Sequence, residues 1–216
     1  MDNNTINTQD STVIGLRGFY MAKYGFENSD VRYTDGGVFF DAVSFQNEPQ
    51  VGEVQKFYVN NVVKYQAGGD RINSENLTFG TDGLSQFTTM YMLGIEPKQR
   101  NIDGNIVETI EFDDDIQAPY LGIGYIETNI AVDGSTTYKP VVYLKARFNV
   151  TGQTINTKGE NYEWQTKSVT ASAIGSDEAK RPVRVESASM LATFEEADAF
   201  VRSILAIPMP TPGQIG

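Results

Sequence analysis

Short apolar runs that alternate with polar residues, with Gly, Asn and Asp between them, make up most of the chain. This pattern is typical of an all-β sandwich or barrel of antiparallel strands. The clearest run is 138–150, where Val142, Leu144 and the alternate residues after them are apolar, while Lys145 and Arg147 are charged. A period of two predicts a strand with one buried face. We expect strands over residues 15–23, 38–45, 53–59, 62–66, 76–79, 120–128, 138–150 and 161–173.

Turn signals stand between several of these runs. Asp-Gly and Asn-Asn pairs tolerate positive φ angles, so each closes a hairpin without strain. The predicted topology is therefore a meander of antiparallel hairpins. The turns are expected at Asn60-Asn61, Val132-Asp133-Gly134 and Thr157-Lys158-Gly159.

Two segments depart from the strand pattern. The sequence TFEE at 193–196 has the form of a capping box, and apolar residues then recur at helical spacing. This predicts a helix over about 194–205 that packs its apolar stripe on the sheet, with the two glutamates as capping residues. A second, shorter helix is expected over 84–93, with Gly94 in the C′ position.

The chain has 216 residues, which suits one domain. We expect a flexible N-terminal arm at 1–12, a single β domain at 13–206 and an extended tail at 207–216 that is rich in proline. The polar N-terminus lacks the form of a signal peptide, and no run approaches about 18 apolar residues. A soluble protein without a membrane segment is expected.

Composition excludes several kinds of chemistry. The chain has no His and no Cys, so it cannot form a thiolate nucleophile, a disulfide, a Ser-His-Asp triad or an ordinary zinc site. Its net charge of −11 repels nucleic-acid phosphates, which argues against a conventional nucleic-acid binder. We expect a protein that is not an enzyme and that has neither a cofactor nor a metal.

The negative charge is concentrated in one segment. Residues 101–138 contain eight acidic residues and no Lys or Arg. The run Asp113, Asp114 and Asp115 lacks the spacing that wraps a calcium ion. A solvated surface loop is one interpretation. The other is a surface that has to be negative, such as the wall of a channel.

Two further motifs consist of glycines and of aromatic residues at alternate positions. Gly122-x-Gly124 is too short for a dinucleotide-binding fingerprint and indicates close packing or a bulge within a strand. Tyr162 and Trp164 occupy alternate positions of a predicted strand, where they would form either a sugar-binding platform or part of a core or interface. No two carboxylates are paired in the manner that a glycosidase needs.

Several motifs, in order, resemble one protein family. VIGLRGFYMAKY at 13–24 looks like the opening strand of major tail proteins of long-tailed bacteriophages, of the phi13 or TP901-1 type. FYVNN at 57–61, with the strand and short helix that follow, resembles the next part of that family, although Asn60 replaces its usual aspartate. YEWQ at 162–165 and FEEADAF at 194–200 resemble its carboxy-terminal half, so the likeness covers most of 13–206.

The resemblance implies a β-sandwich with a flanking helix that forms hexameric rings, which stack into the hollow tail tube through which phage DNA passes. The partners would be further copies of the chain, the tape-measure protein and the tail initiator and terminator proteins. The protein would be made in the bacterial cytoplasm and end in the virion.

Stacked rings need extended arms. A hairpin around residues 46–65, together with the two ends of the chain, would supply them. The acidic run 113–115 would line the lumen and keep DNA from adhering. The alternative is a carbohydrate- or receptor-binding module of a phage particle that uses Tyr162 and Trp164. The candidate interface residues of the hairpin are Glu53, Gln55, Phe57, Tyr58, Asn60 and Asn61.

Overall fold

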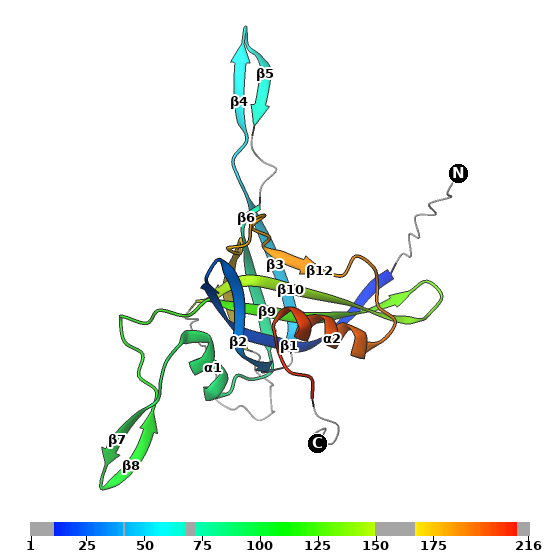
Figure 1. Ribbon diagram of the computed structural model, residues 1–216. Helices are drawn as coiled ribbons and strands as arrows, with labels where there is room; N and C mark the ends of the chain where they lie inside the picture. The colour runs from blue at the N-terminus through cyan, green and yellow to red at the C-terminus, as the bar shows by residue number, and fades with distance from the viewer. Residues whose placement is uncertain (1–10, 41, 68–71, 150–166, 211–216) are drawn as a thin grey trace, which may run out of the picture.

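The structure is a computed structural model that describes residues 11–40, 42–67, 72–149 and 167–210 (Figure 1). It is mostly β, with antiparallel sheets and two short helices, so the predicted fold class is confirmed. The main sheet contains β1 (Ser11–Glu27), β2 (Asp30–Val38), β3 (Ala42–Val51), β6 (Ile72–Thr81), β9 (Leu121–Ala131), β10 (Thr136–Phe148), β11 (Lys167–Ile174) and β12 (Arg184–Glu186).

The strand order in this sheet is β2-β1-β9-β10-β11-β6-β3, and β12 pairs with β10. The predicted meander is therefore wrong beyond its local hairpins, because β1 pairs with β9 and β11 pairs with β6. Two separate hairpins, β4 (Gln55–Val59) with β5 (Val62–Ala67) and β7 (Lys98–Ile102) with β8 (Asn105–Thr109), project from the body (Figure 1).

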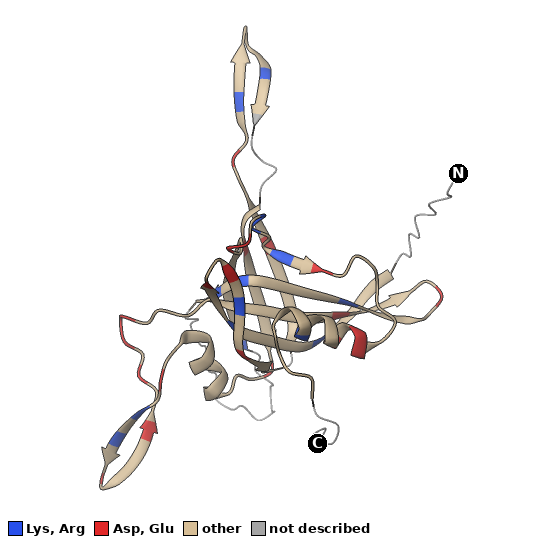
Figure 2. Ribbon diagram, viewed as in Figure 1, with Lys and Arg blue, Asp and Glu red and all other residues tan. Residues whose placement is uncertain are grey.

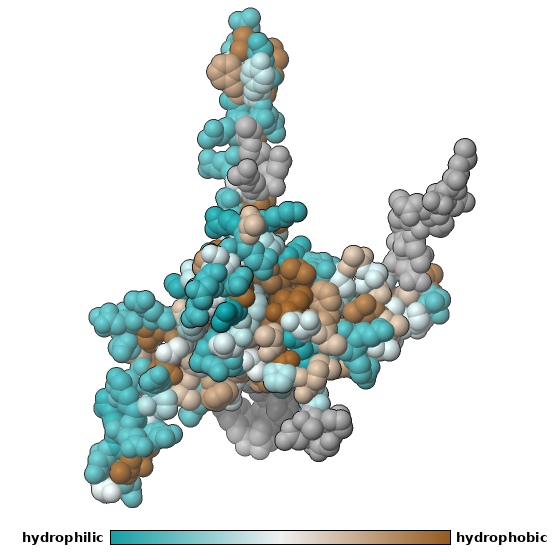
Figure 3. All heavy atoms as spheres, viewed as in Figure 1, coloured by the Kyte–Doolittle hydropathy of each residue, from teal (hydrophilic) through white to brown (hydrophobic). Residues whose placement is uncertain are grey.

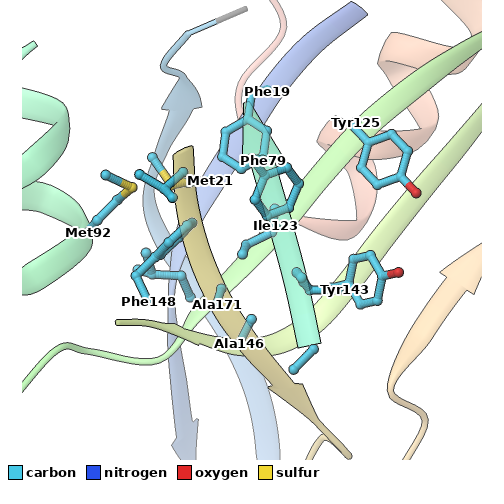
Figure 4. Close-up of a cluster of buried hydrophobic side chains, with 14 of the residues drawn as sticks. Phe19, Met21, Phe79, Met92, Ile123, Tyr125, Tyr143, Ala146, Phe148 and Ala171 are labelled. Atoms are coloured by element: carbon cyan, nitrogen blue, oxygen red, sulfur yellow. The ribbon is translucent and has the colours of Figure 1, made fainter. Parts of the chain in front are cut away.

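The main sheet rolls around an inner core. The rings of Phe19 on β1 and Phe79 on β6 lie 4.7 Å apart, although β9, β10 and β11 separate their strands. In a flat sheet four strand spacings would hold them roughly 19 Å apart. Figure 4 shows these rings together among side chains from several strands. Met92 of helix α1 (Gln86–Leu93) packs against the same core.

The outer face of the rolled sheet is covered by helix α2 (Phe194–Ile204), as predicted. Ala197 and Val201 of this helix pack with Leu205 on Tyr20 and Val142 of the sheet. Because both faces of the sheet are covered, β9 is buried almost continuously from Leu121 to Ile126. Such double coverage replaces the alternation expected of a half-exposed strand.

The expected single buried face of 138–150 is wrong for the same reason. Val142 and Leu144 belong to the outer cluster, whereas Ala146 and Phe148 belong to the inner core. The pairing of β10 with β9 is irregular between Tyr143 and Ala146, and a bulge of this kind moves the following side chains to the opposite face.

The glycines of β9 lie directly beneath α2. A Cβ atom added to Gly122 would stand 2.5 Å from Cδ2 of Leu205, and one added to Gly124 would collide with Cγ1 of Val201. The close-packing interpretation of Gly122-x-Gly124 is confirmed, because the helix approaches a surface that lacks side chains.

Helix α2 begins at the predicted capping box, and helix α1 ends at the predicted Gly94. In the capping box of α2, the Glu196 amide donates to Oγ1 of Thr193 at 3.2 Å, and the Thr193 amide donates to Oε2 of Glu196 at 3.3 Å. Helix α1 starts at Gln86 after the N-cap Ser85, two residues later than expected, and Gly94 ends it with a φ of 69°.

The predicted domain limits shift at both ends. Strand β1 begins at Ser11, so residues 11 and 12 of the expected arm pair with β9. Ile207 of the expected tail is buried in the outer cluster. Among the described residues no helix has the length and apolar character that a membrane crossing needs.

Candidate assembly surfaces

The β4–β5 hairpin extends far from the rolled sheet (Figure 1). Strands β3 and β6 pair along their lengths and form the base of this arm. The turn at the tip is Asn60-Asn61, with φ angles of 52° and 62°, which is the left-handed geometry that tight hairpins favour. The predicted turn is therefore confirmed. Of the candidate interface residues, five lie on this hairpin and Glu53 lies in the segment that leads to it.

The hairpin carries large apolar side chains in solvent (Figure 3). The exposed fractions are 60% for Phe57, 57% for Tyr58 and 63% for Tyr65. Phe57 and Tyr65 contact only loosely, with ring centroids 6.2 Å apart. An isolated two-stranded hairpin is at best marginally stable in water, and an exposed apolar patch marks an interaction surface. We call this hairpin the basic arm. It presents an apolar surface that no other part of the described chain covers.

The basic arm also differs in charge from the rest of the acidic chain. Lys56 and Lys64 lie on its strands, and β4 and β5 contain no acidic residue (Figure 2). Neither lysine forms an ion pair with a described carboxylate, and the nearest charge–ring contact is Lys64 Nζ at 5.7 Å from the Tyr65 centroid. The arm therefore presents unpaired positive charge beside aromatic surface.

A second arm consists of the β7–β8 hairpin and the segment through Asp115, and we call it the acidic arm. Its exposed apolar side chains include Ile102 at 50%, Ile106 at 71% and Phe112 at 59%. Most of its carboxylates have no basic partner among the described residues: Asp103, Glu108, Asp113, Asp114 and Asp115.

Glu111 is the exception within the acidic arm. Arg100 Nε donates to Oε1 of Glu111 at 2.6 Å, and Lys98 Nζ donates to Oε2 at 3.0 Å. These two hydrogen bonds hold the pKa of Glu111 below its usual value. Because the two cations are already engaged, they do not neutralise the other acids. Residues 113–115 are exposed, as a solvated loop requires, and the described residues contain no cluster able to hold a metal ion.

A polar network lies inside the base of the basic arm. The fully buried Glu75 of β6 accepts hydrogen bonds at Oε2 from Asn47 at 3.0 Å, Tyr143 at 3.1 Å and Arg184 at 3.0 Å. Burial raises the pKa of Tyr143 to about 12, so its hydroxyl stays a donor at neutral pH. The network joins β3, β6, β10 and β12 and fixes the root of the arm to the sheet.

An open cleft of about 570 Å³ lies between β1 and α2. The Tyr20 hydroxyl donates to Oδ1 of Asp198 at 2.6 Å, and Arg202 Nε donates to Oδ2 at 2.7 Å. Burial, together with the Asp198 carboxylate, raises the pKa of Tyr20 above its ordinary value. These polar groups satisfy one another, which is the arrangement of a structural contact between helix and sheet.

The β7–β8 hairpin was missed by the interpretation of 101–138 as a loop. Its turn is Asp103-Gly104, with φ angles of 50° and 85°, and this dipeptide is a recognised hairpin signal. The alternation that marks a strand was lacking because every residue of β7 is exposed. Tyr162 and Trp164, the candidate sugar platform, lie outside the described residues.

No protein-family model matches this chain, and neither does any curated protein. The two arms must therefore be interpreted from their own geometry and chemistry.

Proposed function

We propose that this protein is a structural subunit of a bacteriophage tail tube, which assembles as stacked hexameric rings into a conduit for DNA. The observation that carries the proposal is the basic arm, an extended hairpin whose aromatic side chains stand in solvent. It overlaps the hairpin around residues 46–65 that the sequence offered as an arm for stacked rings.

Energetics support assembly. Burying a large apolar side chain contributes about 1.5–3 kcal/mol, so Phe57, Tyr58 and Tyr65 together represent several kcal/mol that the isolated chain does not gain. The strands of the hairpin have only five and six residues, far fewer than the 20–30 residues a side of a standard stable interface. One such contact is weak, and a closed ring or stack multiplies it.

The net charge of the chain also supports a passive conduit. A net charge of −11 repels DNA, which favours free passage over adhesion. The tape-measure, initiator and terminator proteins would set the length and ends of the tube.

The test is negative-stain electron microscopy of the purified protein, with mass measured by light scattering over a range of concentrations. We expect rings or tubes, alone or after addition of the initiator protein. A protein that stays monomeric under all these conditions and cannot join a tail would refute the proposal.

A paired substitution connects the outcome to the basic arm. Phe57→Ser with Tyr65→Ser should abolish rings while the monomer stays folded by circular dichroism. Phe26→Ser is the matched control, because this side chain is 47% exposed and belongs to β1 of the main sheet, not to either arm.

A further inference from the structure

The two arms project from different sides of the rolled sheet (Figure 1). Within one chain their tips are held apart by the body, so one arm cannot cover the other. A surface that one copy cannot cover internally is available to a second copy.

The arms are complementary in charge (Figure 2). The basic arm offers Lys56 and Lys64, which form no ion pair with a described carboxylate, and the acidic arm offers carboxylates at Glu108 and at 113–115 that have no basic partner among the described residues. Arg100 and Lys98, the cations beside those carboxylates, are engaged by Glu111. Opposite potentials on two surfaces steer encounter and fix register.

The arms are also complementary in apolar surface. Phe57 and Tyr65 on the basic arm are matched by Ile106 and Phe112 on the acidic arm, all of them about 60% exposed or more. On each arm apolar and charged side chains occur together, which is the composition of an interface with an apolar centre and a charged rim.

We propose that the basic arm of one copy binds the acidic arm of the next copy, with Lys56 and Lys64 facing the carboxylates of 113–115. The inference rests on the proposed self-assembly and names the two surfaces that meet. Each copy donates one arm and receives one, so the contact is heterologous. Repetition of such a contact gives a ring if it closes and a filament if it does not.

Cross-linking between copies tests the contact directly. The chain has no cysteine, so single thiols are introduced as Lys64→Cys in one preparation and Asp114→Cys in another. A short bis-maleimide is the suitable reagent, because a facing Lys and Asp hold their Cβ atoms farther apart than the 3.5–4.5 Å or so of a disulfide. We expect a cross-linked dimer in the mixed assembly.

The control mixture pairs Lys64→Cys with Glu178→Cys, whose site is exposed on the body and unpaired among the described residues. It should give no dimer. A dimer from Lys64→Cys alone would mean that two basic arms meet each other, and this result would overturn the inference.

Charge reversal supplies a second readout. Lys56→Glu with Lys64→Glu should raise the concentration needed for assembly about tenfold or more, because like charges then face each other. Reversal of the acidic run, Asp113→Lys with Asp114→Lys and Asp115→Lys, should do the same. A mixture of the two reversed chains should form alternating contacts and recover part of the assembly.

A charge-matched control reverses three exposed acids of the body, at Glu27, Asp30 and Glu178, and should assemble as the wild type does. Circular dichroism verifies that each variant is folded. If a charge-reversed variant does not fold, the cross-linking experiment tests the contact in its place.

The outcomes separate this inference from the proposed function. If both charge-reversed variants still form rings, and Lys64→Cys does not cross-link to Asp114→Cys, the pairing of the arms is overturned. The tube proposal would then still stand. Absence of assembly in the wild type would overturn both.

Discussion

Replacement of Arg184 by methionine should strongly destabilise the fold, because it leaves the buried carboxylate of Glu75 without its cation. Arg184 Nη1 lies 3.0 Å from Oε2 of Glu75, whose side chain is fully buried. Oε1 of the same carboxylate is buried and has no hydrogen-bond partner among the described residues. Arg184→Met keeps most of the aliphatic volume and removes the charge.

Breaking a buried ion pair on one side costs about 3–5 kcal/mol. The Arg184 side chain is 34% exposed, so water partly screens the interaction and we expect the lower limit, about 3 kcal/mol. Adding Glu75→Gln removes the unpaired charge but keeps an acceptor for Tyr143 and Asn47. The double variant should therefore recover about 2 kcal/mol of the loss.

The assay is urea unfolding followed by far-ultraviolet circular dichroism, at a protein concentration where light scattering shows only monomer. Glu186→Gln is the control, because its ion pairs with Arg184, at 2.9 Å, and with Lys139 are more exposed than that of Glu75 and should each contribute about 1 kcal/mol or less. A loss below about 1 kcal/mol in Arg184→Met, or no recovery with Glu75→Gln, would show that Arg184 does not compensate Glu75.

Three further variants test other parts of the fold by the same unfolding assay. Gly124→Ala should cost about 1–3 kcal/mol, because its Cβ atom meets Val201, and Val201→Ala should relieve part of that cost in the double variant. Thr193→Ala should cost about 1 kcal/mol through loss of the cap of α2, without a change of fold. Glu127→Gln should stabilise the protein at pH 7, because burial raises the pKa of Glu127 above its ordinary 4.5 and so disfavours its ionised form in the folded state; this gain should shrink as the pH falls toward 4.5 and vanish below it.

Local signals predicted the local elements of this fold. The capping box at Thr193, the helix end at Gly94 and the turn at Asn60-Asn61 each depend on residues within one turn of helix or hairpin, and each was found where expected. The apolar stripe of α2 follows from its period alone. Such features need no knowledge of the distant chain.

Pairing between distant strands could not be predicted in the same way. No local property of β1 selects β9 as its partner, and the bulge after Tyr143 exchanges the two faces of β10 without a distinctive residue. Strand β12 has three residues, and these form a strand only because they pair with β10. The alternation of β10 was misinterpreted because its apolar residues pack into two different clusters, the inner core and the outer cluster beneath α2.

The candidate site was predicted in part. The hairpin with Phe57 and Tyr58 followed from its turn and its β-prone residues. The acidic arm was missed as a structured element because an exposed hairpin such as β7–β8 has no buried face to impose a period of two. That the arms point in different directions depends on how the sheet rolls, which is a property of the whole domain.

The pairing of β1 with β9 also has a consequence for synthesis. The first strand leaves the ribosome long before residues 121–131 exist, and translation adds about 5–20 residues per second, so β1 waits roughly 5–20 s for its partner. The β4–β5 hairpin is local and complete within that interval. Nascent chains on one messenger RNA therefore expose the aromatic residues of β4 and β5 before the main sheet that carries them is complete, and slow translation would favour premature contacts between them.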